Sequence, residues 1–107
     1  MLLAIDVGNT NAVFAIHDGE KFLGDWRCST DHSRTADEYF VWLKHLMNDA
    51  GVKARIDEVI ISSTVPRVVY NLRVLCDRYF DCRPMVVGKP EVDIGPSPRV
   101  DPTTAIG

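Results

Sequence analysis

Runs of apolar and polar residues divide most of the chain into predicted strands and helices. Leu2–Ile5 is short and continuously apolar, which is typical of a buried strand. Residues 6–11 are mostly small or polar, and a second apolar run, Ala12–Ile16, follows them. Asp18-Gly19 favours a two-residue hairpin, and residues 21–28 mix apolar and polar side chains as a third strand does. The opening pattern therefore predicts three consecutive antiparallel strands.

A helical period follows the polar loop 29–34. Thr35 and Glu38 have the spacing of a capping box, in which each side chain bonds to the backbone N–H group of the other residue. Apolar residues then recur at helical intervals from Ala36 to Ala50, and Gly51 is a residue that commonly ends a helix. We therefore expect an amphipathic helix over this range.

A second strand and helix come next. Val59–Ile61 is a β-branched run without alternation, which predicts a strand covered on both faces, as in a parallel sheet. Pro66 fits the first turn of a helix whose apolar face extends to Phe80. The hydroxyl residues 62–64 stand between the two elements, where they are interpreted as helix caps or, alternatively, as one wall of an anion site. A short final strand is expected at residues 85–87.

The composition changes after Gly88. Four prolines and Gly95 lie within residues 89–107, which prevents regular structure, and the segment has too few apolar residues for a core of its own. We therefore expect residues 1–88 to form one half-domain and residues 89–107 to form a Pro-rich tail.

Charge and cysteine content argue against several classes of protein. A net charge of −3 gives no reason to expect nucleic acid or an anionic membrane as a partner. No apolar run approaches the length of a membrane span, and Asp6 interrupts the single candidate for a signal peptide. Cys28, Cys76 and Cys82 lack metal-ligand spacing, so we expect free thiols in a cytoplasmic protein, with a Cys76–Cys82 disulfide as the alternative.

The candidate chemistry lies where the first strand ends. Gly8 and the neighbouring Asn residues tolerate the left-handed backbone that a tight connection needs, and such a turn can aim several N–H groups at a phosphate. Asp6 at the strand end could hold Mg²⁺, which prefers a carboxylate together with phosphate oxygens. The alternative is an ordinary hairpin whose turn contains Gly and Asn. Neither a Walker A loop nor a dinucleotide-binding fingerprint occurs in the sequence.

The segment Asp6–Asn11, directly after an apolar strand, resembles the first phosphate motif of the superfamily of acetate kinase, sugar kinases, actin and the heat-shock chaperone ATPases. More narrowly, Leu2–Ile16, Arg34–Tyr39 and Glu58–Pro66 are similar to segments of type III pantothenate kinases. The resemblance implies an α/β fold, the ribonuclease H-like half-domain. Its sheet is mixed, with three antiparallel N-terminal strands plus parallel strands and flanking helices. The superfamily's second half-domain would be absent from this chain.

The same resemblance implies an activity. Members of the family phosphorylate pantothenate to 4'-phosphopantothenate, the first step of coenzyme A biosynthesis. They use ATP, Mg²⁺ and a monovalent cation such as K⁺ or NH₄⁺, and they generally form homodimers. On this resemblance the metal ligand is Asp6. The residues expected to contact ATP are Asp6, Val7, Gly8, Asn9, Thr10, Asn11, Ala12 and Val13.

Two residues of the tail are assigned to the pantothenate side of the site. Gly107 matches the glycine of the family's Gly-Ala-Asp-Arg motif, and Val100 stands where many members have a Tyr near the substrate. The presumed catalytic Asp of that motif would lie beyond Gly107, so no catalytic residue is assigned and the chain alone is expected to be nearly inactive. The alternatives are a kinase for a sugar or acetate, and a non-catalytic regulatory or binding protein, or an inactive fragment, on the same scaffold.

Overall fold

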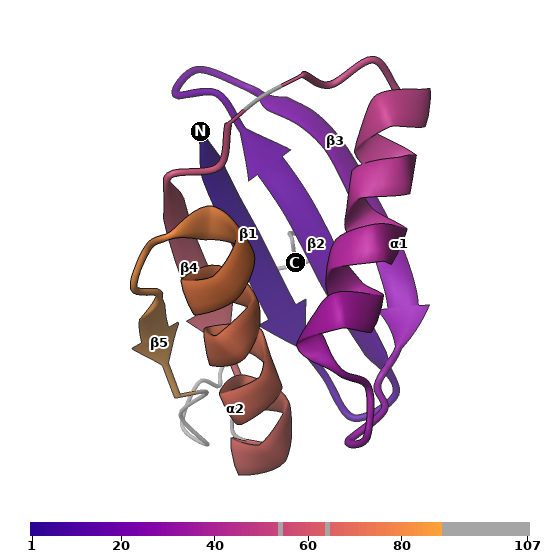
Figure 1. Ribbon diagram of the computed structural model, residues 1–107, viewed down its shortest axis with the longest axis vertical. Coiled ribbons are helices and arrows are strands. Elements are labelled where there is room, and N and C mark those ends of the chain that lie inside the picture. The colour runs from indigo at the N-terminus through magenta and orange to yellow at the C-terminus, as the bar shows by residue number, and fades with distance from the viewer. Residues whose placement is uncertain (54, 64, 89–107) are drawn as a thin grey trace, which may run out of the picture.

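A mixed sheet of five strands forms the centre of the computed structural model, which describes residues 1–53, 55–63 and 65–88 (Figure 1). Its elements in chain order are β1 (Leu2–Val7), β2 (Asn11–His17), β3 (Phe22–Ser29), α1 (Ala36–Asp49), β4 (Glu58–Ser62), α2 (Pro66–Leu75), the π-helix η1 (Cys76–Phe80) and β5 (Met85–Val87). The strand order is β3-β2-β1-β4-β5. The first three strands pair antiparallel, whereas β4 runs parallel to both β1 and β5. This topology confirms the predicted α/β class.

Both α1 and α2 lie on one face of the sheet (Figure 1). The burial of β1 alternates accordingly, because successive side chains of a strand point to opposite faces. Leu3, Ile5 and Val7 are buried, whereas the residues between them are only partly buried. Phe14 of β2 is fully buried, and its ring centre lies 5.6 Å from that of Tyr39 on α1. The core therefore sits between the helices and one face of the sheet.

The predicted capping box at the start of α1 is confirmed. The Thr35 hydroxyl accepts the Glu38 N–H group at 3.2 Å, and the Thr35 N–H group donates to the Glu38 carboxylate at 2.8 Å. Two of the N–H groups left without a helical acceptor at this end are thereby satisfied. Gly51 has a positive φ of 75°, which glycine adopts without strain, and the helix ends just before it.

The predicted two-residue hairpin at Asp18-Gly19 is wrong. His17 pairs with Phe22, so four residues connect β2 to β3. The Asp18 carboxylate accepts the N–H groups of Glu20 and Lys21 at 2.8 and 2.9 Å, and these bonds stabilise the longer loop. The same bonds lower the pKa of the Asp18 carboxyl.

The second helix begins at Pro66 as predicted, but its cap is different from the one expected. The N-cap residue is Val65, which has no capping side chain, so the interpretation of the preceding serines as helix caps is wrong. The Ser63 hydroxyl instead accepts the Val65 N–H group at 3.0 Å. Thr64 lies outside the described residues. The last turn also differs, because Cys76–Phe80 is a π-helix rather than a continuation of the α-helix.

Two predictions about chain chemistry can be compared with the described residues. The three cysteines are free, as predicted, and Cys76 and Cys82 are not joined by a disulfide. The longest described helix, α1, has 14 residues, whereas a span needs about 20 apolar residues, and no described helix is long and apolar enough to cross a membrane. The tail 89–107, with its predicted lack of regular structure, lies outside the described residues.

Candidate phosphate-binding site

The connection between β1 and β2 is a four-residue turn. Val7 pairs with Ala12, and the Gly8 N–H group donates to the Asn11 carbonyl at 2.8 Å across the turn. None of its residues has a positive φ, so the predicted left-handed backbone is wrong. Four residues spread the reversal of direction over more dihedral angles than two, and each residue can stay in an ordinary region. A Cβ atom on Gly8 would lie 3.4 Å from the Asn11 carbonyl oxygen, so the turn itself has room for an alanine there.

Two backbone amides of the turn point away from internal partners. Asn9 and Thr10 are exposed, and neither N–H group donates to an acceptor within the described residues. The Asn11 side-chain amide donates to the Thr10 hydroxyl at 3.3 Å. The turn therefore offers two adjacent N–H donors and a hydroxyl at the surface, which is chemistry suited to an anion.

Thr30, the residue after β3, holds this turn from the side. Its hydroxyl donates to the Gly8 carbonyl at 2.9 Å, and its N–H group donates to the Thr10 carbonyl at 2.8 Å. The bond to the Gly8 carbonyl fixes the peptide unit that also carries the Asn9 N–H group, so this N–H group, on the opposite edge of the unit, stays turned outward. The bond to the Thr10 carbonyl fixes the peptide unit that carries the Asn11 N–H group. Sequence reasoning missed Thr30, because a contact between residues so far apart leaves no local signal.

Asp6 lies next to the turn at the end of β1. It is partly buried, and it alternates with the core residues of its strand, so its side chain is on the face away from the helices. Strand register places Val13 of β2 beside it on one side and Ser62 of β4 on the other. Ser62 does not cap α2. Parallel pairing of β1 with β4 instead brings Ser62, with its hydroxyl group, next to Asp6, the candidate metal ligand.

The loop between β3 and α1 is fixed by Arg34. The guanidinium donates to the Ser29 carbonyl at 2.6 Å and lies 5.8 Å from the centre of the Tyr39 ring. From α2, the Asn71 amide donates to the Arg34 carbonyl at 2.9 Å. Arg34 therefore has an internal structural role, and the loop that contains Thr30 is held by both helices.

The remaining predicted site residues are distributed as follows. Val7 and Ala12 are 2% and 1% exposed, so their side chains belong to the core and only their backbone is available to a ligand. Val100 and Gly107 lie outside the described residues. No cluster of three or more His, Cys, Asp or Glu side chains among the described residues could hold a metal ion by itself. A metal at Asp6 would therefore need ligands from a bound molecule, as Mg²⁺ on a nucleotide has.

Comparison with known proteins decides the family. The family model described as type III pantothenate kinase matches residues 2–107. The chain belongs to the type III pantothenate kinase family. The match includes the β1–β2 turn, Thr30, Arg34 and the junction between β4 and α2, so the geometry above is that of the family's N-terminal region.

Relatives in the family are considerably longer than this chain. The type III pantothenate kinase of Cereibacter sphaeroides (strain ATCC 17029) is 64% identical over 107 residues, which is all of this chain and 42% of the relative. Those of Dinoroseobacter shibae and Paracoccus denitrificans are also 64% identical, and the chain covers 42% and 41% of their lengths. The chain thus spans about two-fifths of the length of the curated relatives it matches.

Proposed function

We propose that this chain forms the phosphate-binding wall of a kinase that transfers a phosphoryl group from ATP to pantothenate, giving 4'-phosphopantothenate for coenzyme A biosynthesis. The single observation that carries the proposal is the pair of N–H groups at Asn9 and Thr10, without acceptors among the described residues, in the exposed turn that directly follows the strand containing Asp6. Phosphoryl transfer depends mostly on positioning and on neutralising charge, and this turn provides donors for both purposes. The names of the relatives support the same reaction.

Asp6 is proposed to hold Mg²⁺ together with the ATP phosphates. One partly buried carboxylate near the end of the strand that leads into the turn fits an ion that arrives with its nucleotide. When bound, Mg²⁺ would neutralise phosphate charge. Ser62 of β4, which pairs with Asp6 of β1, would donate a hydrogen bond to the Asp6 carboxylate or to a water ligand of the Mg²⁺ ion. The K⁺ or NH₄⁺ requirement is carried over from the family, with no ligand assigned.

The remaining parts of the proposal concern the whole protein. Pantothenate would lie on the side of Val100 and Gly107, and the protein would be a cytoplasmic homodimer. Because one wall cannot enclose a nucleotide or exclude water, the 107 residues alone should bind ATP weakly and transfer little phosphate.

A chimera tests the activity directly. Residues 1–107 of this chain would be joined to the remaining part of the Cereibacter sphaeroides relative, and pantothenate phosphorylation would be measured with ATP and Mg²⁺. We expect activity in the chimera and a loss of 100-fold or so in kcat for Asp6→Asn, because a charge on the metal ligand is removed (about 2.7 kcal/mol). Equal rates in the two proteins would reject the role of Asp6.

Gly8→Ala separates a phosphate site from an ordinary hairpin. The turn accommodates a Cβ atom at this position without strain, so the free energy of unfolding should change by less than about 1 kcal/mol. A phosphate approaching the backbone would meet that methyl group, so ATP affinity should fall about tenfold (~1.4 kcal/mol).

If the chimera folds, binds ATP and yet transfers no phosphate, the non-catalytic binding protein becomes the better assignment.

A further inference from the structure

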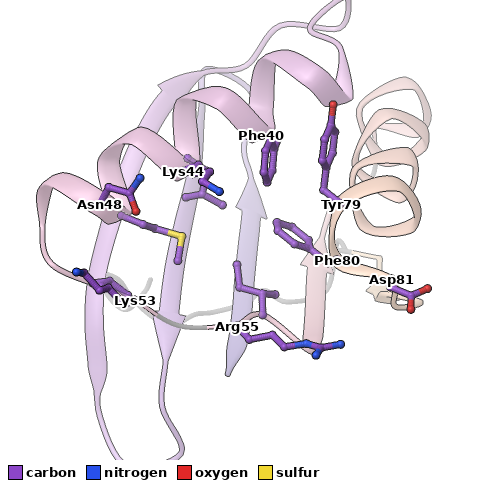
Figure 2. Close-up of a pocket in the computed structure, with 12 residues that line it drawn as sticks. Phe40, Lys44, Asn48, Lys53, Arg55, Tyr79, Phe80 and Asp81 are labelled. Carbon is purple, nitrogen blue, oxygen red and sulfur yellow. The ribbon is translucent and has the colours of Figure 1, made fainter.

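A groove lies between α1 and η1, away from the phosphate turn. Its volume is about 580 Å³, within the range of roughly 300–1,000 Å³ typical of small-molecule sites. Later turns of α1 form one side, the segment before β4 forms the base and η1 forms the other side (Figure 2). The apolar floor includes Leu43, Met47 and Ile56. We call this the α1–η1 groove.

The π-helix shapes the aromatic wall of the groove. Tyr79 stacks on Phe40 with ring centres 4.0 Å apart and planes 4° from parallel, and the adjacent Phe80 lies 6.3 Å from the same ring (Figure 2). In an α-helix, neighbouring residues point about 100° apart, so the wider π turn helps two successive rings to face α1. Short π-helices are rare and occur frequently at functional sites.

Polar contacts to Asp37, near the start of α1, also hold the aromatic wall of the groove in place. The Tyr79 hydroxyl donates to the Asp37 carboxylate on α1, and Arg78 forms an ion pair with the same carboxylate at 2.9 Å. The bond to Asp37 raises the pKa of the Tyr79 hydroxyl. The aromatic rings are therefore held in place before any ligand arrives, which reduces the entropy that binding must overcome.

The charge lining the groove is opposite to that of the chain. Lys44, Lys53 and Arg55 line it, and the single carboxylate among its lining residues is Asp81. The chain as a whole carries a net charge of −3. The Lys44 ammonium lies 5.5 Å from the centre of the Phe40 ring, so a positive charge stands directly beside the apolar wall. An anionic group with an attached apolar or aromatic portion would satisfy both halves of this surface.

We propose that the α1–η1 groove binds a small organic anion that carries an aromatic or aliphatic portion. The site is separate from the phosphate turn, since α1 begins beside that turn and the groove is lined by its middle and later residues. The anionic group of the ligand is thus recognised by Lys53 and Arg55, and its apolar portion packs on the floor formed by Leu43, Met47 and Ile56.

Titration with anilinonaphthalene sulfonate, a fluorescent aromatic anion, tests the proposal on the 107-residue chain and on the chimera. We expect saturable binding of one probe per chain, and weaker binding of the neutral analogue phenylnaphthylamine. The double variant Lys53→Gln, Arg55→Gln should weaken probe binding about tenfold, because two charge-assisted contacts are lost. Both residues are exposed, so the melting temperature should stay unchanged.

A matched variant controls for total charge. Lys21→Gln with Arg27→Gln removes two exposed cations outside the groove and should leave probe affinity within twofold of the parent value. Equal affinity in the groove variant and the parent would overturn the proposal. So would binding by the 107-residue chain that is lost in the chimera, since the groove would then be covered by another part of the protein.

Discussion

Thr30→Val is the most informative single perturbation of the phosphate turn. Valine keeps the shape of threonine but removes the hydroxyl that donates to the Gly8 carbonyl at 2.9 Å. The backbone bond from the Thr30 N–H group to the Thr10 carbonyl is retained. The turn is thereby released at one of its two points of attachment, while β3 and its neighbours are left as they are.

The size of the effect follows from the burial of the bond. A hydrogen bond within a protein contributes about 0.5–1.5 kcal/mol net, and this one is only partly buried, so water can replace the donor. We expect the free energy of unfolding to fall by about 0.5–1 kcal/mol in urea denaturation. ATP affinity should fall by up to about fivefold, because some binding energy must then order the turn.

Amide hydrogen exchange gives a readout that does not depend on ATP. The Gly8 N–H group, which donates across the turn to the Asn11 carbonyl, should exchange faster in Thr30→Val, whereas the N–H groups of α1 should be unaffected. Thr30→Ser, which keeps the hydroxyl, should restore both exchange and affinity. Unchanged exchange in the turn of Thr30→Val would refute the reasoning, because the hydroxyl would then contribute nothing to its order.

Three other measurements test separate parts of the structure. Thr35→Ala removes the α1 cap and should lower the free energy of unfolding by about 1 kcal/mol; an unchanged urea midpoint would contradict this. Hydrogen bonds from Tyr79 and Arg78 lower the pKa of the Asp37 carboxyl. The contribution of the ionised Asp37 to the stability of the fold is therefore complete above the unfolded pKa of about 3.9, and it is lost as pH falls through the lower folded pKa. The melting temperatures of the parent and Asp37→Asn should accordingly converge below about pH 4. A difference in melting temperature that stays the same at all pH values would contradict the role of the Asp37 carboxylate. Burial raises the pKa of Cys76 to about 12, so iodoacetamide at pH 8 should label Cys76 more slowly than Cys28; equal rates, read by mass spectrometry, would disprove this.

The sequence was most informative where a signal is local and physical. The capping box at Thr35 and Glu38, the stop at Gly51 and the proline at the start of α2 depend on a few neighbouring residues, and all three are found as predicted. The apolar run of β4 predicted a strand in a parallel sheet that is covered on both faces. The parallel pairing is found, because β4 pairs with β1 and β5, but the coverage on both faces is wrong: burial alternates along β4 and both helices lie on one face of the sheet.

Predictions failed where tertiary contacts decide the geometry. Whether Asp18 begins a two- or four-residue loop depends on the register of β3, and whether Gly8 needs a positive φ depends on the length of the turn. The clamp by Thr30 and the placement of Ser62 beside Asp6 arise from strand pairing between distant segments. Residue propensities contain no information on such pairings, so only the candidate ligand Asp6 and the turn itself could be identified from the sequence.

The π-helix has a consequence for how this region can vary. Each of its hydrogen-bonded turns contains one residue more than an α-helical turn, so removing a single residue between positions 76 and 80 would convert it into ordinary helix. Such a deletion would rotate the following ring by about 100° and dismantle the stack against α1, while β5 could still reach its place at the sheet edge. A one-residue gap here in an alignment of homologues would therefore mark proteins in which that surface has been lost.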